Sequence, residues 1–301
     1  ATTGEDNTAV GQNSQTRTTT GTGNTSIGRE SMDKNTTGAS NVAVGMYALY
    51  GNTTASNNTA LGKSALETNT TGANNTGLGY RALLTNNGSS NVAVGYDAGL
   101  SMTTGSNNTI MGSTAGDALT TGGMNVAIGQ GALGGTTTGN YNVAVGRAAL
   151  SDNTTADNNT AVGYAALNAN TTTSNLTAIG YNALKSNTTG TNGVAVGKDA
   201  LEANTTGHNN VAVGLEALQT NTGGSGSTAI GTGALALSTA SDLTAVGRSA
   251  LGVNSTGIEN TAVGAYALDA NTTGQHNTAV GHQALSANTT AQYNTAVGRN
   301  A

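Results

Sequence analysis

The sequence predicts an all-β fold, a parallel β-solenoid of about eighteen 17-residue coils. The first observation behind this prediction is a repeated phrase, Asn-Thr-Ala-Val-Gly, whose glycine recurs eighteen times from residue 11 to residue 298. Of the seventeen spacings between these glycines, fifteen equal 17 and two equal 16. Because so short a segment cannot bury a core by itself, each repeat must stack on its neighbours as one coil.

The second observation is the pattern within one repeat, where Asn, Thr and Gly separate two short apolar patches. The three residues before each glycine alternate with period two, which predicts strands such as 42–44 and 211–213. The second patch is an Ala-Leu pair, as in Ala48-Leu49 and Ala166-Leu167. A helix is excluded because every repeat carries Asn, Thr and Gly, which favour turns.

The orientation of the strand residues follows from placing the larger side chains in the core. With Val and Ile facing inward, the Val/Ile and Leu columns become continuous inner stripes of the stack. Ala43, Ala161, Ala212 and Ala279 then face outward beside the repeated glycine. An outer stripe of Ala and Gly lets another backbone approach closely, which predicts that several chains associate along their length.

Two Asn columns are expected to form ladders of side-chain amides between stacked coils. One Asn lies four residues before the glycine in fourteen of the eighteen repeats, and the other begins the Asn-Thr-Thr turn, as at Asn69 and Asn170. Many of these residues formally match the Asn-X-Thr acceptor of N-glycosylation. We interpret the triplets instead as a by-product of the repeated turns and ladders.

One variable column stands out as a candidate contact surface, namely the position directly after the repeated glycine. It holds six of the ten basic residues and four of the nine tyrosines. We interpret it as an exposed stripe that contacts glycans or a partner surface, and alternatively as a solvated rim or an ion-pair seam between chains. The residues of this contact stripe are Arg29, Lys63, Tyr80, Tyr96, Arg147, Tyr164, Tyr181, Lys198, Arg248 and Arg299.

Composition predicts one solenoid domain over residues 1–301, with divergent first coils in residues 1–37 and a last coil that stops midway. The sequence has no Cys, and His208, His276 and His282 lack the spacing of a metal site. No constellation for catalysis or cofactor binding is present, so we expect a protein that is not an enzyme and uses no cofactor. A net charge of −5 argues against nucleic acid as a partner, and no apolar run is long enough to span a membrane.

Several repeats resemble the head repeats of trimeric autotransporter adhesins, notably residues 41–45, 125–129 and 142–146. The longer pattern from residue 277 through Ala284-Leu285 to Asn288 is similar to repeats of phage tail fibres and bacterial surface fibres. The adhesin resemblance implies a left-handed parallel β-roll, a homotrimer and a role in attachment. The 17-residue repeat is longer than the usual repeat of that family, so each coil carries extra turn residues.

These expectations together indicate a structural and adhesive segment of an extracellular fibre, displayed on a cell surface or on a virion. The partner expected first is the chain itself, as a homotrimer, with a host-surface glycan or protein receptor as a further partner. The alternative is an extracellular filament built by end-to-end stacking, since joining residue 301 to residue 1 leaves a coil three residues short of the consensus. The abundant Thr raises a third hypothesis, an ice-binding solenoid, but its Thr-X-Thr face is interrupted by Val.

Overall fold

The structure is a computed structural model that describes residues 3–301, so residues 1 and 2 of the predicted domain lie outside the described part. Its described residues form strands, turns and bends and no helix, which confirms the all-β prediction. The chain divides into two compact units, unit 1 (Ala1–Ala156) and unit 2 (Asp157–Ala301), each with nine strands. That the whole chain is one domain stays a prediction.

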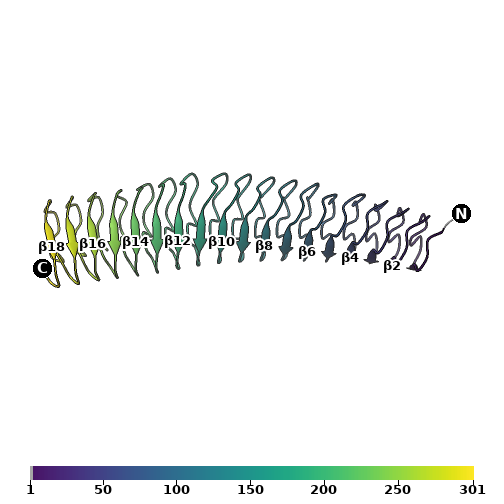
Figure 1. The fold of residues 1–301 in the computed structure, drawn as a ribbon, viewed down its shortest axis with the longest axis horizontal. Helices are drawn as coiled ribbons and strands as arrows, with labels where there is room; N and C mark the ends of the chain where they lie inside the picture. The colour runs from purple at the N-terminus through teal and green to yellow at the C-terminus, as the bar shows by residue number, and fades with distance from the viewer. Residues whose placement is uncertain (1–2) are drawn as a thin grey trace. The chain divides into compact units, whose positions relative to one another are not determined.

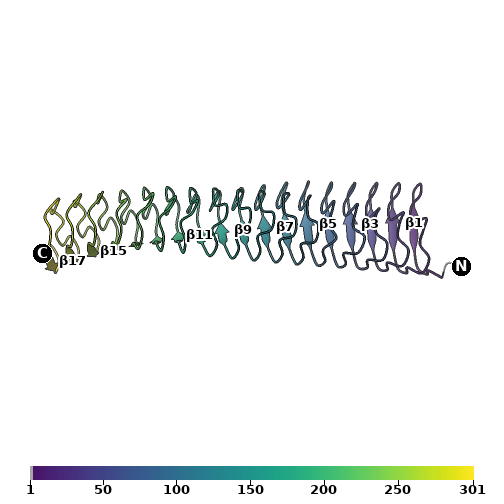
Figure 2. The same ribbon diagram turned by 90° about the horizontal axis from the view of Figure 1, so that it is seen from above.

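Each coil contributes one three-residue strand, and we number the coils by their strands (Figures 1 and 2). The strands of unit 1 are β1 Thr8–Val10, β2 Thr25–Ile27, β3 Val42–Val44, β4 Thr59–Leu61, β5 Thr76–Leu78, β6 Val92–Val94, β7 Thr109–Met111, β8 Val126–Ile128 and β9 Val143–Val145. The strands of unit 2 are β10 Thr160–Val162, β11 Thr177–Ile179, β12 Val194–Val196, β13 Val211–Val213, β14 Thr228–Ile230, β15 Thr244–Val246, β16 Thr261–Val263, β17 Thr278–Val280 and β18 Thr295–Val297.

Within each unit, consecutive strands pair in parallel with equivalent residues opposite one another. Val42 pairs with Thr59 and Ala43 with Ala60, and the same register holds between β17 and β18. The divergent first coils follow the pattern too within residues 3–37, since β1 and β2 pair in the same way. This in-register parallel pairing of equivalent repeat positions confirms the predicted β-solenoid and its 17-residue coil.

The orientation predicted for the strand residues is wrong, because the middle residue of each strand faces inward. Ala43, Ala161, Ala212 and Ala279 are fully buried, whereas Val42 is 39% exposed. The physical reason is the width of the coil. Leucines from the opposite wall fill the core, as shown at Gly77, where an added Cβ would lie 3.3 Å from Leu66 Cγ. Only a small side chain fits between that wall and the strand.

The Leu column is buried as predicted, but its backbone adopts an unexpected conformation. Leu49 is fully buried and has φ +49°, and the equivalent residues Leu66, Leu83 and Leu167 share this left-handed backbone. A left-handed residue costs about 1–2 kcal/mol when it carries a side chain. Burial of the leucine and the bond from Leu49 N to the Ala65 carbonyl (3.0 Å) offset this cost.

The repeated glycine is required both by its backbone and by its neighbour in the next coil. Gly45 has φ +136°, which L side chains rarely adopt. A Cβ on Gly45 would also lie 2.5 Å from the carbonyl oxygen of Gly62, well inside contact distance. Every coil therefore turns away from its strand at a residue that tolerates no side chain.

Both Asn ladders form as predicted. In the first column, the backbone N–H of Asn58 donates to Asn41 Oδ1 (2.9 Å), and the Asn58 side chain donates to the Gly72 carbonyl (2.9 Å). In the second column, Asn52 Nδ2 donates to Asn35 Oδ1 (2.9 Å). These amides are fully buried, so a triplet that begins at a buried ladder residue, such as Asn52-Thr53-Thr54, has an acceptor that is inaccessible to glycosylation in the folded chain. Asn57 and Asn74 are exposed and also begin Asn-X-Thr triplets.

Candidate interaction surface

The outer face of the strands is a candidate interaction surface because it carries exposed apolar side chains in twelve of the eighteen coils and half-buried ones in the other six. The position directly before the repeated glycine holds Val, Ile, Leu or Met throughout the eighteen strands. The position three before the glycine holds Thr or Val. We call these two columns the strand face. Its exposed apolar members are Val10, Ile27, Val42, Leu61, Val92, Met111, Ile128, Ile179, Ile230, Val263, Val280 and Val297.

The strand face was placed in the core by the sequence argument, although one signal in the sequence pointed outward. Thr and Val alternate freely three positions before the glycine, as at Thr59 and Val42, and a hydroxyl is tolerated there because the position faces solvent. Neither column contains a charged residue in any coil. The result is an uncharged, mainly apolar face on each unit.

The contact stripe lies next to the strand face, one residue beyond the repeated glycine, and all ten of its residues are exposed as expected. Two of its basic groups are engaged by acids at the following position. Arg29 pairs with Glu30 at 3.1 Å, and Lys198 pairs with Asp199 at 3.2 Å. The hydrogen bond from Lys198 to Asp199 raises the pKa of Lys198. The stripe is therefore partly neutralised by its own neighbours.

The four tyrosines of the contact stripe form two stacked pairs. The ring centroids of Tyr80 and Tyr96 lie 5.4 Å apart with an interplanar angle of 19°, and those of Tyr164 and Tyr181 lie 5.2 Å apart at 13°. These distances approach the spacing of neighbouring strands, about 4.8 Å. Each pair is thus stacked along the direction in which the coils succeed one another.

An ion pair that the sequence analysis missed supports the first tyrosine stack. Arg81 lies beside Tyr80, with Cζ 5.0 Å from the ring centroid, and it binds Asp97 through Nε (2.8 Å) and a terminal nitrogen (2.5 Å). The hydrogen bonds to Asp97 raise the pKa of Arg81 further. Lys63 lies over the same ring at 5.7 Å. The sequence did contain a signal for this ion pair, because Arg81 and Asp97 are 16 residues apart, which is the length of one short coil.

The three histidines do not come together as a metal site. His276 pairs with Glu259 at 3.1 Å and stacks on Tyr293, whereas His282 lies edge-on to Tyr266. Within residues 3–301 no group of three or more His, Asp or Glu is arranged to hold a metal ion. The same residues include no helix that is long and apolar enough to cross a membrane.

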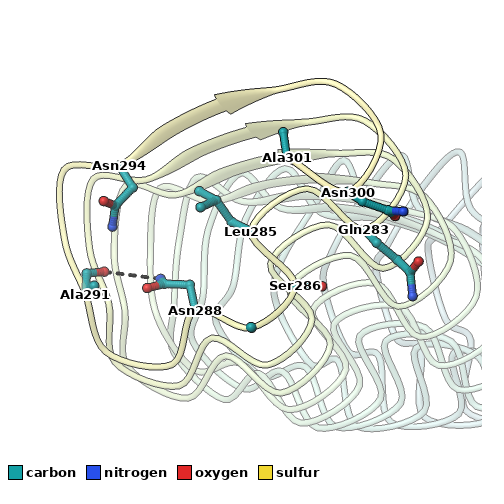
Figure 3. A pocket seen from close by; sticks show the side chains of 9 residues that line it. Gln283, Leu285, Ser286, Asn288, Ala291, Asn294, Asn300 and Ala301 are labelled. Atoms are coloured by element: carbon teal, nitrogen blue, oxygen red, sulfur yellow. Dashed lines mark hydrogen bonds between the residues drawn. The ribbon is translucent and has the colours of Figure 1, made fainter.

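A hollow with a volume of about 490 Å³ lies at the last coil of unit 2 (Figure 3). Leu285 and Asn288 face it from the positions that point into the core of other coils. Asn288 Nδ2 donates to the Ala291 carbonyl at 3.2 Å. Its lining residues are Gln, Leu, Ser, Ala and Asn, which offer hydrogen bonds but no titratable group.

Comparison with known proteins adds no family to these observations. No protein-family model matches the chain, and no curated protein matches it significantly.

Proposed function

We propose that this chain is a structural and adhesive segment of an extracellular fibre and that it assembles side by side with two further copies of itself. The observation that carries the proposal is the strand face, which presents exposed Val, Ile, Leu or Met in twelve of the eighteen coils and has no charged residue in either column. Nine strands at about 4.8 Å make this apolar stripe roughly 40 Å long in each unit. Exposed apolar patches of this extent mark protein interfaces.

An identical chain is the best occupant for this face. The position directly before the repeated glycine is apolar in every coil, and the coils follow one another at a constant distance. A second copy placed level with the first therefore meets an apolar residue at every coil. Closed symmetry is also the usual arrangement of soluble homo-oligomers. The number three comes from the resemblance to trimeric adhesins. The strand face takes the place of the Ala columns as the expected interface, because the Ala columns are buried and cannot contact another chain.

The repetitive fold is compatible with a structural role, and we assign no catalytic activity to it. The contact stripe remains exposed beside the strand face and is our candidate for contact with a host-surface glycan or protein. Display on a cell surface or a virion follows from this role. Antibody labelling of intact cells or virions tests the location, and labelling that requires cell lysis contradicts it.

The assembly is tested by the mass of the protein in solution. Sedimentation equilibrium of the wild type should give a mass near three times 29.3 kDa. Replacing apolar residues of the strand face by Glu should yield monomers whose strand content by circular dichroism is unchanged, because these side chains lie outside the core. The four substitutions are Leu61→Glu, Ile128→Glu, Ile179→Glu and Ile230→Glu.

A matched control places the same four charges on another exposed column, the Thr that lies two residues after the Asn that begins the turn or after its equivalent. The control substitutions are Thr54→Glu, Thr121→Glu, Thr189→Glu and Thr256→Glu, all at exposed positions. This variant should stay trimeric. A folded wild-type monomer at micromolar concentration would contradict the proposal, and long polymers in electron micrographs would favour end-to-end stacking instead.

A further inference from the structure

In the contact stripe of unit 1, a tyrosine is followed in the next coil by a much smaller residue, so that one face of the tyrosine ring is left open. Tyr96 in coil 6 is 53% exposed, whereas its stacking partner Tyr80 in coil 5 is 39% exposed. Tyr80 is covered by Tyr96 on one side and approached by Lys63 of coil 4. Tyr96 has Tyr80 on one side only, and the next residue of the column, in coil 7, is Ser113.

The surface beyond Tyr96 is low and polar. Coil 7 lies directly beside Tyr96 in the stack of coils, because the N–H of Thr114 donates to the Tyr96 carbonyl at 2.9 Å. Ser113 and Gln130 are exposed at the two following positions of the column. At Gly131, the residue after Gln130, an added Cβ would meet no atom within 4 Å. A ring face thus stands above a floor that offers two hydroxyl groups and one amide.

The second tyrosine stack lacks this step. The residue after Tyr181 in the column is Lys198, whose long side chain is held at the surface by Asp199. The column position that follows Tyr181 therefore holds a long side chain, where the position that follows Tyr96 holds a serine. Only the stack in unit 1 ends against a residue as small as serine.

We propose that the open face of Tyr96, above Ser113 and Thr114, binds one pyranose ring of a glycan. A pyranose has an apolar face of C–H groups and a rim of hydroxyl groups. The C–H hydrogens carry partial positive charge and meet the negative face of the tyrosine ring. The hydroxyl rim meets the hydroxyl groups of Ser113 and Thr114 and the amide of Gln130, which both donate and accept hydrogen bonds.

A saccharide fits this place better than an apolar peptide side chain. An apolar side chain gains most where several apolar groups enclose it, whereas here only one wall is aromatic and the floor is polar. The ion pair of Arg81 and Asp97 supports the stack, since it joins coils 5 and 6 and Arg81 Cζ lies 5.0 Å from the centroid of the Tyr80 ring. This inference deepens the proposed adhesive function and names the ligand class for it.

Saturation-transfer difference NMR on the full chain tests the site with three probes, the methyl β-pyranosides of glucose, galactose and mannose at millimolar concentration. The wild type should transfer saturation to the ring C–H protons of at least one of them. Ser113→Tyr should reduce this transfer at least tenfold, because the added ring occupies the open face as Tyr96 occupies that of Tyr80. Tyr96→Ala should do the same by removing the platform.

Thr232→Tyr is the matched control, because it adds a tyrosine at an exposed position of the same column in unit 2. It should leave the transfer unchanged. The column already accepts tyrosine in four coils, so Ser113→Tyr should keep its strand content and thermal midpoint. Absence of transfer to all three sugars, or equal transfer in wild type and Ser113→Tyr, overturns the proposal.

The oligomeric state of the same samples separates this result from the proposed assembly. Trimers that bind none of the three sugars overturn the glycan site and leave the assembly standing. Monomers that bind a sugar through Tyr96 overturn the trimer and leave the site standing.

Discussion

Coils 3 and 4 and coils 6 and 7 of unit 1 fill the same core cross-section with different residues. In coil 3, Ala43 of the strand lies inside the coil together with Leu49, and Asn52 begins the turn. Coils 6 and 7 carry glycine where most other coils carry leucine, at Gly99 and Gly116. The strand of coil 7 compensates, because it carries isoleucine where most strands carry alanine.

The geometry shows that the isoleucine takes the space that the leucines leave. A Cβ on Gly99 would lie 3.2 Å from Ile110 Cδ1, and a Cβ on Gly116 would lie 3.3 Å from the same atom. Met102 and Leu119, which are fully buried, replace the Asn of the second ladder in these two coils. The comparison teaches that the solenoid conserves core volume, while the identity of the residue at each column is free to change.

The repeated glycine has the same backbone conformation in both kinds of coil, and substitutions of this glycine should give the largest loss of stability. Gly45→Ala in coil 3 and Gly112→Ala in coil 7 should each destabilise by about 4 kcal/mol or more, since φ is near +136° at both and a Cβ meets the next coil's carbonyl oxygen at 2.5–2.6 Å. Gly131→Ala, with φ +64° and open space around it, should cost about 1 kcal/mol. Urea unfolding measures all three, and similar losses at Gly131 and Gly45 would refute the argument from the close approach.

Restoring the common residue in coil 7 should weaken the protein. Ile110→Ala should lower the free energy of unfolding by about 2–4 kcal/mol, because Gly99 and Gly116 leave a cavity that alanine cannot fill. Adding Gly99→Leu and Gly116→Leu to this variant should recover much of the loss. The reverse change in a regular coil, Ala43→Ile, should cost about 1–3 kcal/mol through overpacking. An unchanged free energy of unfolding in Ile110→Ala would refute the claim that Ile110 fills the space left by the two glycines.

The two Asn ladders should differ in their tolerance of apolar residues. Asn58→Leu should cost about 2–3 kcal/mol, because the buried N–H of Asn75 loses its acceptor, Asn58 Oδ1 at 2.9 Å. Asn69→Leu should cost about 1 kcal/mol. In coil 6, where Met102 replaces this Asn, the N–H of Gly105 binds the Thr120 carbonyl at 3.2 Å instead. Equal costs in urea unfolding would show that the second ladder is as necessary as the first.

The smallest expected effect concerns Asp117 in coil 7, whose pKa is raised by burial. Because the folded state disfavours its charge, stability is highest below the pKa of the unfolded chain and falls as the pH rises through the folded pKa. Asp117→Asn should therefore match the wild type in acid and exceed it at neutral pH, by about half a kcal/mol or less. Thermal midpoints at a series of pH values measure the difference, and a gain that is largest in acid would contradict this sign.

The repeat allowed the coil, the strands and both Asn ladders to be predicted, because period and turn chemistry depend on local sequence. It did not allow the facing of the strand to be predicted. Ranking Val above Ala by hydrophobicity put Val42 inside, whereas the space left by Leu49 and its equivalents admits only Ala43. Packing against another segment of the coil decides this, and strand periodicity alone is symmetric between the two faces.

The candidate surface was predicted in part for the same reason. The exposure of the contact stripe followed from its variability, as at Arg147 and Tyr181. The open face of Tyr96 depends on which residue the next coil places beside it, and so does the compensation of Gly99 by Ile110. Both require the register between coils, which becomes readable once the strands are paired.

The 17-residue register also determines how each unit would respond to a pulling force. Bonds between coils connect residues a single coil apart, such as Leu49 to Ala65 and Asn58 to Asn75. A force on one end of a unit therefore acts on the outermost coil first. When that coil unfolds, the force acts on the next coil. Each step releases about 60 Å of extended chain. Every unit can in this way lengthen gradually under load, in small steps of nearly equal length, and shorten again as the coils re-form.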